Sequence, residues 1–270
     1  MAHLPLVVCS KTENQAFSCT AQDNLSGLNN NSPPVFVLAT TVPAGMETAN
    51  ASTNAQGLCD LAGNCSTAGP ISGNMIDLKP PAISITTPSS GATYTANQTV
   101  KAAYACSDLG SGVASCTGTV PNGSRIDTSP NGTSTTKSFT VKAIDAIGNQ
   151  SSQATTYTVS CHYMTLGINP STVPKGSKIT VTGTIMSCAH NAQTISEKFT
   201  LTGPLGRACA RSSTVMFTTP PFTLPAGTSK TISFPSLVPK SACSGTYTTT
   251  ATTLMGGTAI DSTSATLTVQ

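Results

Sequence analysis

The chain has 270 residues, of which only 9% are charged, and its net charge is +3. The Lys and Arg residues are scattered rather than gathered in a basic stripe, which argues against nucleic-acid binding. No run reaches the roughly 18 apolar residues that span a bilayer, so we expect no membrane span.

Short segments of alternating polarity, rich in Thr, Ser and Val, are separated by Gly, Pro and Asn turns along the whole chain. This pattern predicts an all-β protein, and an apolar content of 38% suits several small cores better than one large core. The even number of ten cysteines favours an oxidising compartment, so we expect an extracellular or cell-surface location. The opening segment MAHLPLVVCS lacks the basic region of a secretory signal peptide.

Two internal repeats begin at the N-terminus. The segment CTAQDNLSGL (19–28) matches AYACSDLGSGV (103–113), and LCDLAGNCS (58–66) matches AIDAIGNQS (143–151). Both copies keep the order Asp-x-x-Ser-Gly followed by Asp-x-x-Gly-Asn, with 37 positions between the two aspartates. This common spacing indicates two related modules.

Domain boundaries follow from these repeats. Pro80 and Pro81 forbid helix and favour an extended linker before a strand at 82–86. Strand-like alternation continues after residue 160 without the repeated aspartates, as in KITVTGTIM and GTYTTTATTL. We therefore predict three modules, which comprise residues 1–80, 81–160 and 161–270.

The repeated units YACSDLGSGVASCTGTVPNGSRIDTS and SFTVKAIDAIGNQSS resemble bacterial immunoglobulin-like repeats of large secreted or surface proteins. The resemblance covers about residues 5–160, and the third module is similar to a divergent C-terminal immunoglobulin-like module. It implies tandem immunoglobulin-like β-sandwiches that serve as spacers, adhesion elements or accessory modules, and it carries no catalytic set over to this chain.

The strand order of such a sandwich implies five intrachain disulfides within the modules. Each bridge is expected to join strand ends or strands that run side by side. At about 2–3 kcal/mol each, these bridges would matter for modules with thin cores. The predicted pairs are Cys9–Cys19, Cys59–Cys65, Cys106–Cys116, Cys161–Cys188 and Cys209–Cys243.

The repeated aspartates permit two interpretations. Each aspartate can cap its own turn by accepting backbone N–H hydrogen bonds. Alternatively, the paired loops can lie at one end of each sandwich and bind Ca²⁺ through carboxylate, amide and carbonyl oxygens. The residues of this calcium hypothesis are Asp23, Asp60 and Asn64 in the first repeat and Asp108, Asp145 and Asn149 in the second.

Catalytic motifs are absent from the sequence: it has no G-x-S-x-G, H-E-x-x-H or Gly-rich phosphate loop. A bridge between Cys161 and Cys188 would draw His162 and His190 together, where Ser187 or Glu197 could complete a hydrolytic or metal-binding cluster. His3 has no such context.

Two functions remain open at this point. The first is a non-enzymatic, monomeric extracellular array that acts as a spacer or adhesion segment and contacts a protein or polysaccharide. The alternative is a secreted hydrolase of esters, lactones or glycosides, with Ca²⁺ at the aspartate loops. The sequence identifies neither a ligand nor a parent protein.

Overall fold

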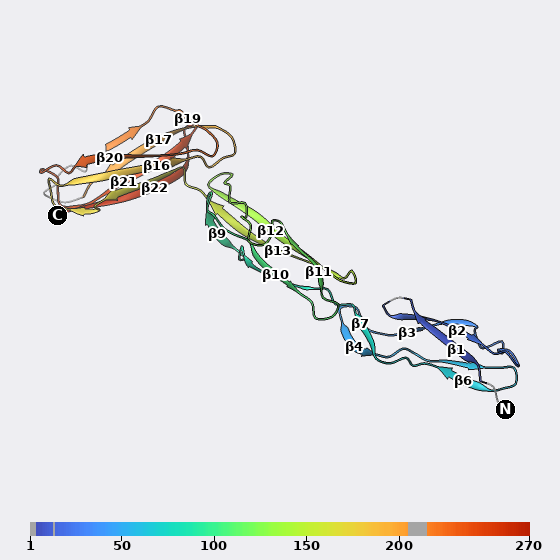
Figure 1. Ribbon diagram of the computed structural model, residues 1–270. Helices are drawn as coiled ribbons and strands as arrows, with labels where there is room; N and C mark the ends of the chain where they lie inside the picture. The colour runs from blue at the N-terminus through green and yellow to red at the C-terminus, as the bar shows by residue number, and fades with distance from the viewer. Residues whose placement is uncertain (1–3, 13, 205–214) are drawn as a thin grey trace. The chain divides into compact units, whose positions relative to one another are not determined.

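The structure is a computed structural model that describes residues 4–12, 14–204 and 215–270. Within these residues the chain forms strands and turns but no helix, so the all-β prediction is confirmed. No helix among the described residues is long and apolar enough to cross a membrane. The contacts divide the chain into two compact units, whose strands are labelled in Figure 1.

The first unit comprises Met1–Thr86, Ala103–Asn122 and Thr140–Ala154. Its N-terminal part holds a three-stranded antiparallel sheet and two strand pairs. The sheet consists of β1 (Leu6–Lys11), β2 (Ala16–Gln22) and β3 (Val35–Ala39), and the pairs are β4 (Glu47–Ala51) with β7 (Asn74–Asp77) and β5 (Gln56–Cys59) with β6 (Cys65–Ala68).

Alternation along these strands places small and apolar side chains in one core. In β3 the side chains of Phe36 and Leu38 are buried, whereas those of Val35 and Val37 are exposed, as the two-residue period of a strand requires. Phe36 and Leu38 pack with Cys19, Leu58 and neighbouring small residues. This core is thin, which is consistent with the stabilising role expected for the disulfides.

The second repeat contributes strands to both units. β10 (Ala103–Ser107) and β11 (Val113–Gly118) belong to the first unit, and β9 (Ala92–Thr95) belongs to the second. β8 (Ala82–Thr87), β12 (Ser134–Asp145) and β13 (Gln150–Ser160) contribute residues to each. The hydrogen-bonded sheets are β10-β8 and β11-β12-β13-β9, with β9 parallel to β13.

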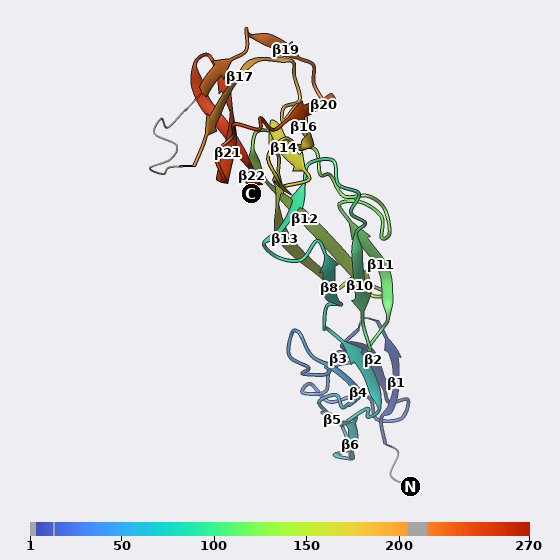
Figure 2. The same cartoon turned by 90° about the vertical axis from the view of Figure 1, so that its left-hand side faces the viewer.

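The C-terminal part of the second unit consists of two facing sheets (Figure 2). One contains β14 (Met164–Asn169), β16 (Lys178–Met186) and β20 (Ser229–Leu237). The other contains β15 (Thr172–Val173), β22 (Thr258–Val269), β21 (Gly245–Met255), β17 (Gln193–Thr202) and β18 (Val215–Thr218), and β19 (Phe222–Leu224) also pairs with β17. Apolar side chains from both sheets, such as Ile179 and Leu267, meet in a core between them.

Four of the five predicted disulfides are confirmed, with Cα–Cα distances of 4.0–5.9 Å. Cys243 is also disulfide-bonded, but its predicted partner Cys209 lies outside the described residues. The division into three immunoglobulin-like modules with boundaries near 80 and 160 stays a prediction. The confirmed pairs are Cys9–Cys19, Cys59–Cys65, Cys106–Cys116 and Cys161–Cys188.

Candidate functional site

The first aspartate of each repeat closes a tight loop. Oδ1 of Asp23 accepts hydrogen bonds from the N–H groups of Leu25, Ser26 and Gly27, at 2.7–3.0 Å. In the second repeat, Oδ1 of Asp108 accepts a bond of 2.9 Å from the N–H of Gly112.

The motif requires glycine at the end of this loop. Gly27 and Gly112 have φ angles of +78° and +80°, which side chains with a Cβ rarely adopt. The turn geometry therefore explains why Asp and Gly recur together in the two copies.

The second aspartate of each repeat is buried and holds an asparagine four residues later. Asp60 and Asp145 are each only 2% exposed. In both loops the Asn N–H donates to Oδ1 at 2.7 Å and the Asn Nδ2 donates to Oδ2 at 2.7 Å, through Asn64 in the first repeat and Asn149 in the second. The two loops are thus the same structure built twice.

These hydrogen bonds determine the charge state of the buried aspartates. The side chain of Asn64 lowers the pKa of Asp60 against the opposing effect of burial. Burial by itself would raise the pKa of Asp145, but the bonds from Asn149 and the backbone outweigh it and the pKa is lowered. Both carboxyl groups are therefore held in the ionised form.

The two loops of each repeat lie against one another, as the sequence predicted. The N–H of Leu61 donates to the carbonyl oxygen of Gly27 at 2.9 Å, and in the second repeat Ala146 donates to Gly112 at 3.0 Å. The backbones of the two loops that carry the residues of the calcium hypothesis are therefore in contact in each repeat.

In both repeats, however, the carboxylates accept protein N–H bonds and each asparagine turns its NH₂ toward an aspartate. An amide oxygen facing a carboxylate would repel it, so this orientation is the one that the charges require. The arrangement is therefore that of capped turns, and calcium binding at these residues stays a prediction.

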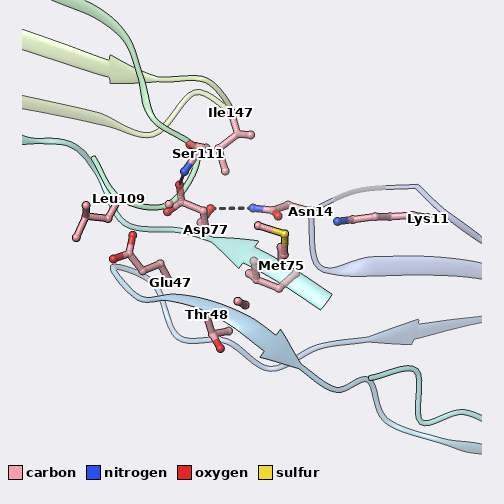
Figure 3. Close-up of a pocket in the computed structure, with 12 residues that line it drawn as sticks. Lys11, Asn14, Glu47, Thr48, Met75, Asp77, Leu109, Ser111 and Ile147 are labelled. Atoms are coloured by element: carbon pink, nitrogen blue, oxygen red, sulfur yellow. Dashed lines mark hydrogen bonds between the residues drawn. The ribbon is translucent and has the colours of Figure 1, made fainter. Parts of the chain in front are cut away.

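The loops of the second repeat also contact the end of β7, where Asp77 is 7% exposed (Figure 3). Oδ2 of Asp77 accepts a 2.7 Å bond from the N–H of Ser111, and Oδ1 accepts a 3.0 Å bond from the N–H of Lys79. The carbonyl oxygen of Asp77 accepts bonds from Nδ2 of Asn14 at 2.8 Å and of Asn149 at 3.2 Å. One residue thus joins three segments of the first unit.

A pocket of about 450 Å³ surrounds this junction. One carboxylate oxygen from each of Glu47, Asp77 and Asp108 lies within 4.8 Å of the other two. Nζ of Lys79 lies 2.9 Å from Oε1 of Glu47, and this hydrogen bond and charge raise the pKa of Lys79. Lys79 is therefore one counter-ion for the three carboxylates. We name Asp77 and its hydrogen-bond partners, together with Glu47, Asp108 and Lys79, the Asp77 junction.

Three residues of the Asp77 junction were not predicted from the sequence. Glu47, Asp77 and Lys79 lie outside the repeated motifs, although IDLKPP stands directly before the linker. An Asp and a Lys directly before a predicted domain boundary are a signal for contacts at that boundary. The lysine that neutralises the carboxylates comes from this segment and not from the repeated loops.

The hypothesised histidine cluster comprises His162 and His190 with Ser187 or Glu197. Nδ1 of His162 lies 3.1 Å from Oδ1 of Asp261, and His190 is exposed. Ser187 donates to the carbonyl oxygen of Ala189, while Glu197 accepts a bond from Thr253. Among the described residues, His162, Ser187 and Glu197 thus have different hydrogen-bond partners, and the cluster stays a prediction. His3 lies outside the described residues.

No family model and no curated protein matches the chain. Solved structures with partial similarity include the Pseudomonas fluorescens alkylpurine DNA glycosylase AlkC (16% identity, TM-score 0.31), which covers 41% of this chain and 31% of its own. The sporulation control protein Spo0M of Bacillus subtilis (12%, 0.28) covers 40% and 48%, and a β-glucosidase of Listeria innocua (16%, 0.28) covers 39% and 16%. The chain thus spans less than half of each of these structures.

Proposed function

We propose that the chain is a segment of an extracellular array of β-sandwich repeats and acts as a spacer or adhesion element. The observation that carries this proposal is the Asp77 junction, in which the last strand of the first repeat is hydrogen-bonded to both aspartate loops of the second. An array whose repeats are tied by side-chain contacts resists bending better than one whose repeats are joined only by a linker.

Charge and burial favour a structural role for this junction. The carboxylate of Asp77 is buried, and burial would raise its pKa, but hydrogen bonds from Ser111 and Lys79 outweigh this and lower it. Its two oxygens are both occupied by N–H donors of the chain. A group held in this way serves packing between segments rather than attack on a substrate.

The linker adds a further contact to the same end of the second repeat. The Oγ of Ser151, which follows the Asp145 loop, donates to the carbonyl oxygen of Pro81 at 2.6 Å. Pro80 is held extended by its own ring and by the Pro81 that follows it. The proposal thus rests on a short, stiff linker together with a hydrogen-bonded junction, and its partner is an extracellular protein or polysaccharide.

Small-angle X-ray scattering of the full chain and of Asp77→Ala tests the proposal. We expect the variant to show a broader distribution of interatomic distances, because the N–H groups of Ser111 and Lys79 lose the carboxylate that they bind. Asp127→Ala is the matched control, since Asp127 is exposed and pairs with Lys137 outside this junction. An unchanged distribution for Asp77→Ala would contradict the proposal.

An activity screen gives an independent test. The purified protein is incubated with ester, lactone and glycoside substrates, with and without a chelator. We expect no turnover, and turnover that Asp108→Ala abolishes would replace the array by the hydrolase alternative. Calorimetric titration of the chelator-treated protein with Ca²⁺ tests the calcium prediction in the same samples.

A further inference from the structure

The C-terminal sheet pair encloses an apolar cavity of about 430 Å³ within the second unit. Its walls come from both sheets: Leu166, Val181 and Ile185 on one side and Phe199 on the other are among the lining residues. These four side chains are only partly buried, although they face the interior of a β-sandwich. Protein interiors are normally close-packed, so an unfilled space of this size is unusual. Its volume is in the range of pockets that hold small molecules.

One carboxyl group interrupts this apolar lining. In β17 the alternating residues Ile195, Glu197, Phe199 and Leu201 share a face, and Glu197 is 1% exposed. Its Oε1 accepts a 2.8 Å bond from the Oγ1 of Thr253. Its Oε2 is buried and has no hydrogen-bond partner among the described residues. A buried polar atom of this kind requires a partner, which the described residues do not supply.

We propose that this cavity binds an uncharged apolar molecule with a single hydroxyl group, which pairs with Oε2 of Glu197. The apolar walls select the hydrocarbon part of the ligand, and the carboxyl group selects its head group. A hydroxyl group suits this position because it can both donate and accept a hydrogen bond, so it pairs with either protonation state of the carboxyl.

Charged ligands fit the cavity less well. Burial, with the nearby charge of Asp261, raises the pKa of Glu197 against the bond from Thr253, so the neutral acid is favoured. An anion would meet further negative charge from Asp261. A cation would be transferred into an apolar space with one carboxyl group as its partner, and the desolvation of both charges opposes that.

Binding of octanol to the full chain, followed by the shift of the thermal transition and by calorimetry, tests the proposal. We expect saturable binding that is about tenfold tighter than that of octane at equal free concentrations, because only octanol satisfies Oε2. In Glu197→Leu this preference should disappear, and in Glu197→Gln it should persist, since the amide retains a donor at the same place. Equal binding of the two ligands by the native protein would overturn the role of Glu197, and tighter binding of octylamine than of octanol would overturn the uncharged class.

A cavity-filling variant keeps the test valid if the Glu197 variants fail to fold. A Cβ at Gly183 would meet only Sδ of Met164 at 3.6 Å and Cδ2 of Leu166 at 3.7 Å, both in side chains that line the cavity. Gly183→Val should therefore weaken octanol binding at least tenfold while the fold is retained. Gly167→Val makes the same change on an exposed position of β14, where a Cβ meets nothing within 4 Å, and should bind octanol normally. Identical binding by Gly183→Val and the native protein would place octanol outside the cavity and overturn the proposal.

Discussion

The two repeats build the same pair of loops, yet among the described residues the first loop of the second repeat also holds a carboxylate from another segment. In the first repeat the N–H of Ser26 donates to Asp23 of its own loop. In the second repeat the corresponding N–H, that of Ser111, donates to Asp77. The motif thus specifies the loop, and the residues around it determine what the loop binds.

The position before this serine differs most between the copies. It is Leu25 in the first repeat, where the side chain is 75% exposed, and Gly110 in the second. A Cβ at Gly110 would lie 2.4 Å from Oδ2 of Asp77, which is closer than real contacts allow. Glycine at this position therefore lets the carboxylate approach, and a side chain there would keep it away.

The largest expected effect is the loss of a buried aspartate. Asp60→Ala and Asp145→Ala each leave an asparagine N–H and its NH₂ group without the buried carboxylate that accepts their bonds. We expect both variants to lower the melting temperature by about 8–15 °C. The decreases, measured by circular dichroism, should agree within error, because the asparagine bonds to the two aspartates are the same. A large effect at only one site would show that the repeats are not energetically equivalent.

Acid should remove most of the difference in melting temperature between each alanine variant and the native protein. Because the folded-state pKa values of Asp60 and Asp145 lie below the ordinary value of 3.8, their stabilising contribution is complete above that value. It is lost as the pH falls through the lowered folded-state pKa. In melts between pH 6 and pH 2, the gap between native protein and either alanine variant should be constant above pH 5 and narrow steadily below pH 4. A gap that stays constant to pH 2 would refute a role for the ionised carboxylates.

The aspartate loops and the disulfides could be predicted from the sequence, because both depend on residues that lie close together in the chain. Asp-x-x-Gly-Asn encodes a capped turn within five residues, and two cysteines in adjacent antiparallel strands encode their bridge once the strand order is known. The meeting of the two loops in each repeat followed from the same order.

Other parts of the site depend on contacts between distant residues and could not be predicted. Asp77 meets Ser111 and Asn149 across 34 and 72 positions, and nothing in a single sequence marks such a pair. Glu197 was considered as a partner for histidines because of its residue type. Its burial in an apolar cavity depends instead on the alternation of β17 and on the opposite sheet, so its hydrogen-bonding environment could be described only from the structure.

A smaller effect is expected at the position that distinguishes the two loops. Gly110→Ala should push Asp77 away from the N–H of Ser111 and lower stability by about 1–3 kcal/mol, the usual cost of a forced close contact. Leu25→Ala removes an exposed side chain and should stay within about 0.5 kcal/mol of the native protein. Hydrogen exchange followed by mass spectrometry should show faster exchange over residues 108–113 in the first variant. Unchanged exchange there would mean that the contact with Asp77 contributes nothing to the stability of the loop.

The smallest effect concerns the asparagines that the two repeats share. Asn64→Ala and Asn149→Ala each remove the side-chain bond to Asp60 or Asp145, which costs the same in both loops. Asn149 also donates to the carbonyl oxygen of Asp77 at 3.2 Å, whereas the Asn64 side chain donates to Asp60. Asn149→Ala should therefore lower the free energy of unfolding by about 0.5–1.5 kcal/mol more than Asn64→Ala does. Because alanine at position 77 keeps this backbone carbonyl, the additional cost of Asn149→Ala should persist in an Asp77→Ala background, and a double-mutant cycle of the two should show little coupling. Equal costs for the two asparagines in the native background would show that the bond to Asp77 adds no stability, and the junction would then rest on Ser111 and Lys79 alone.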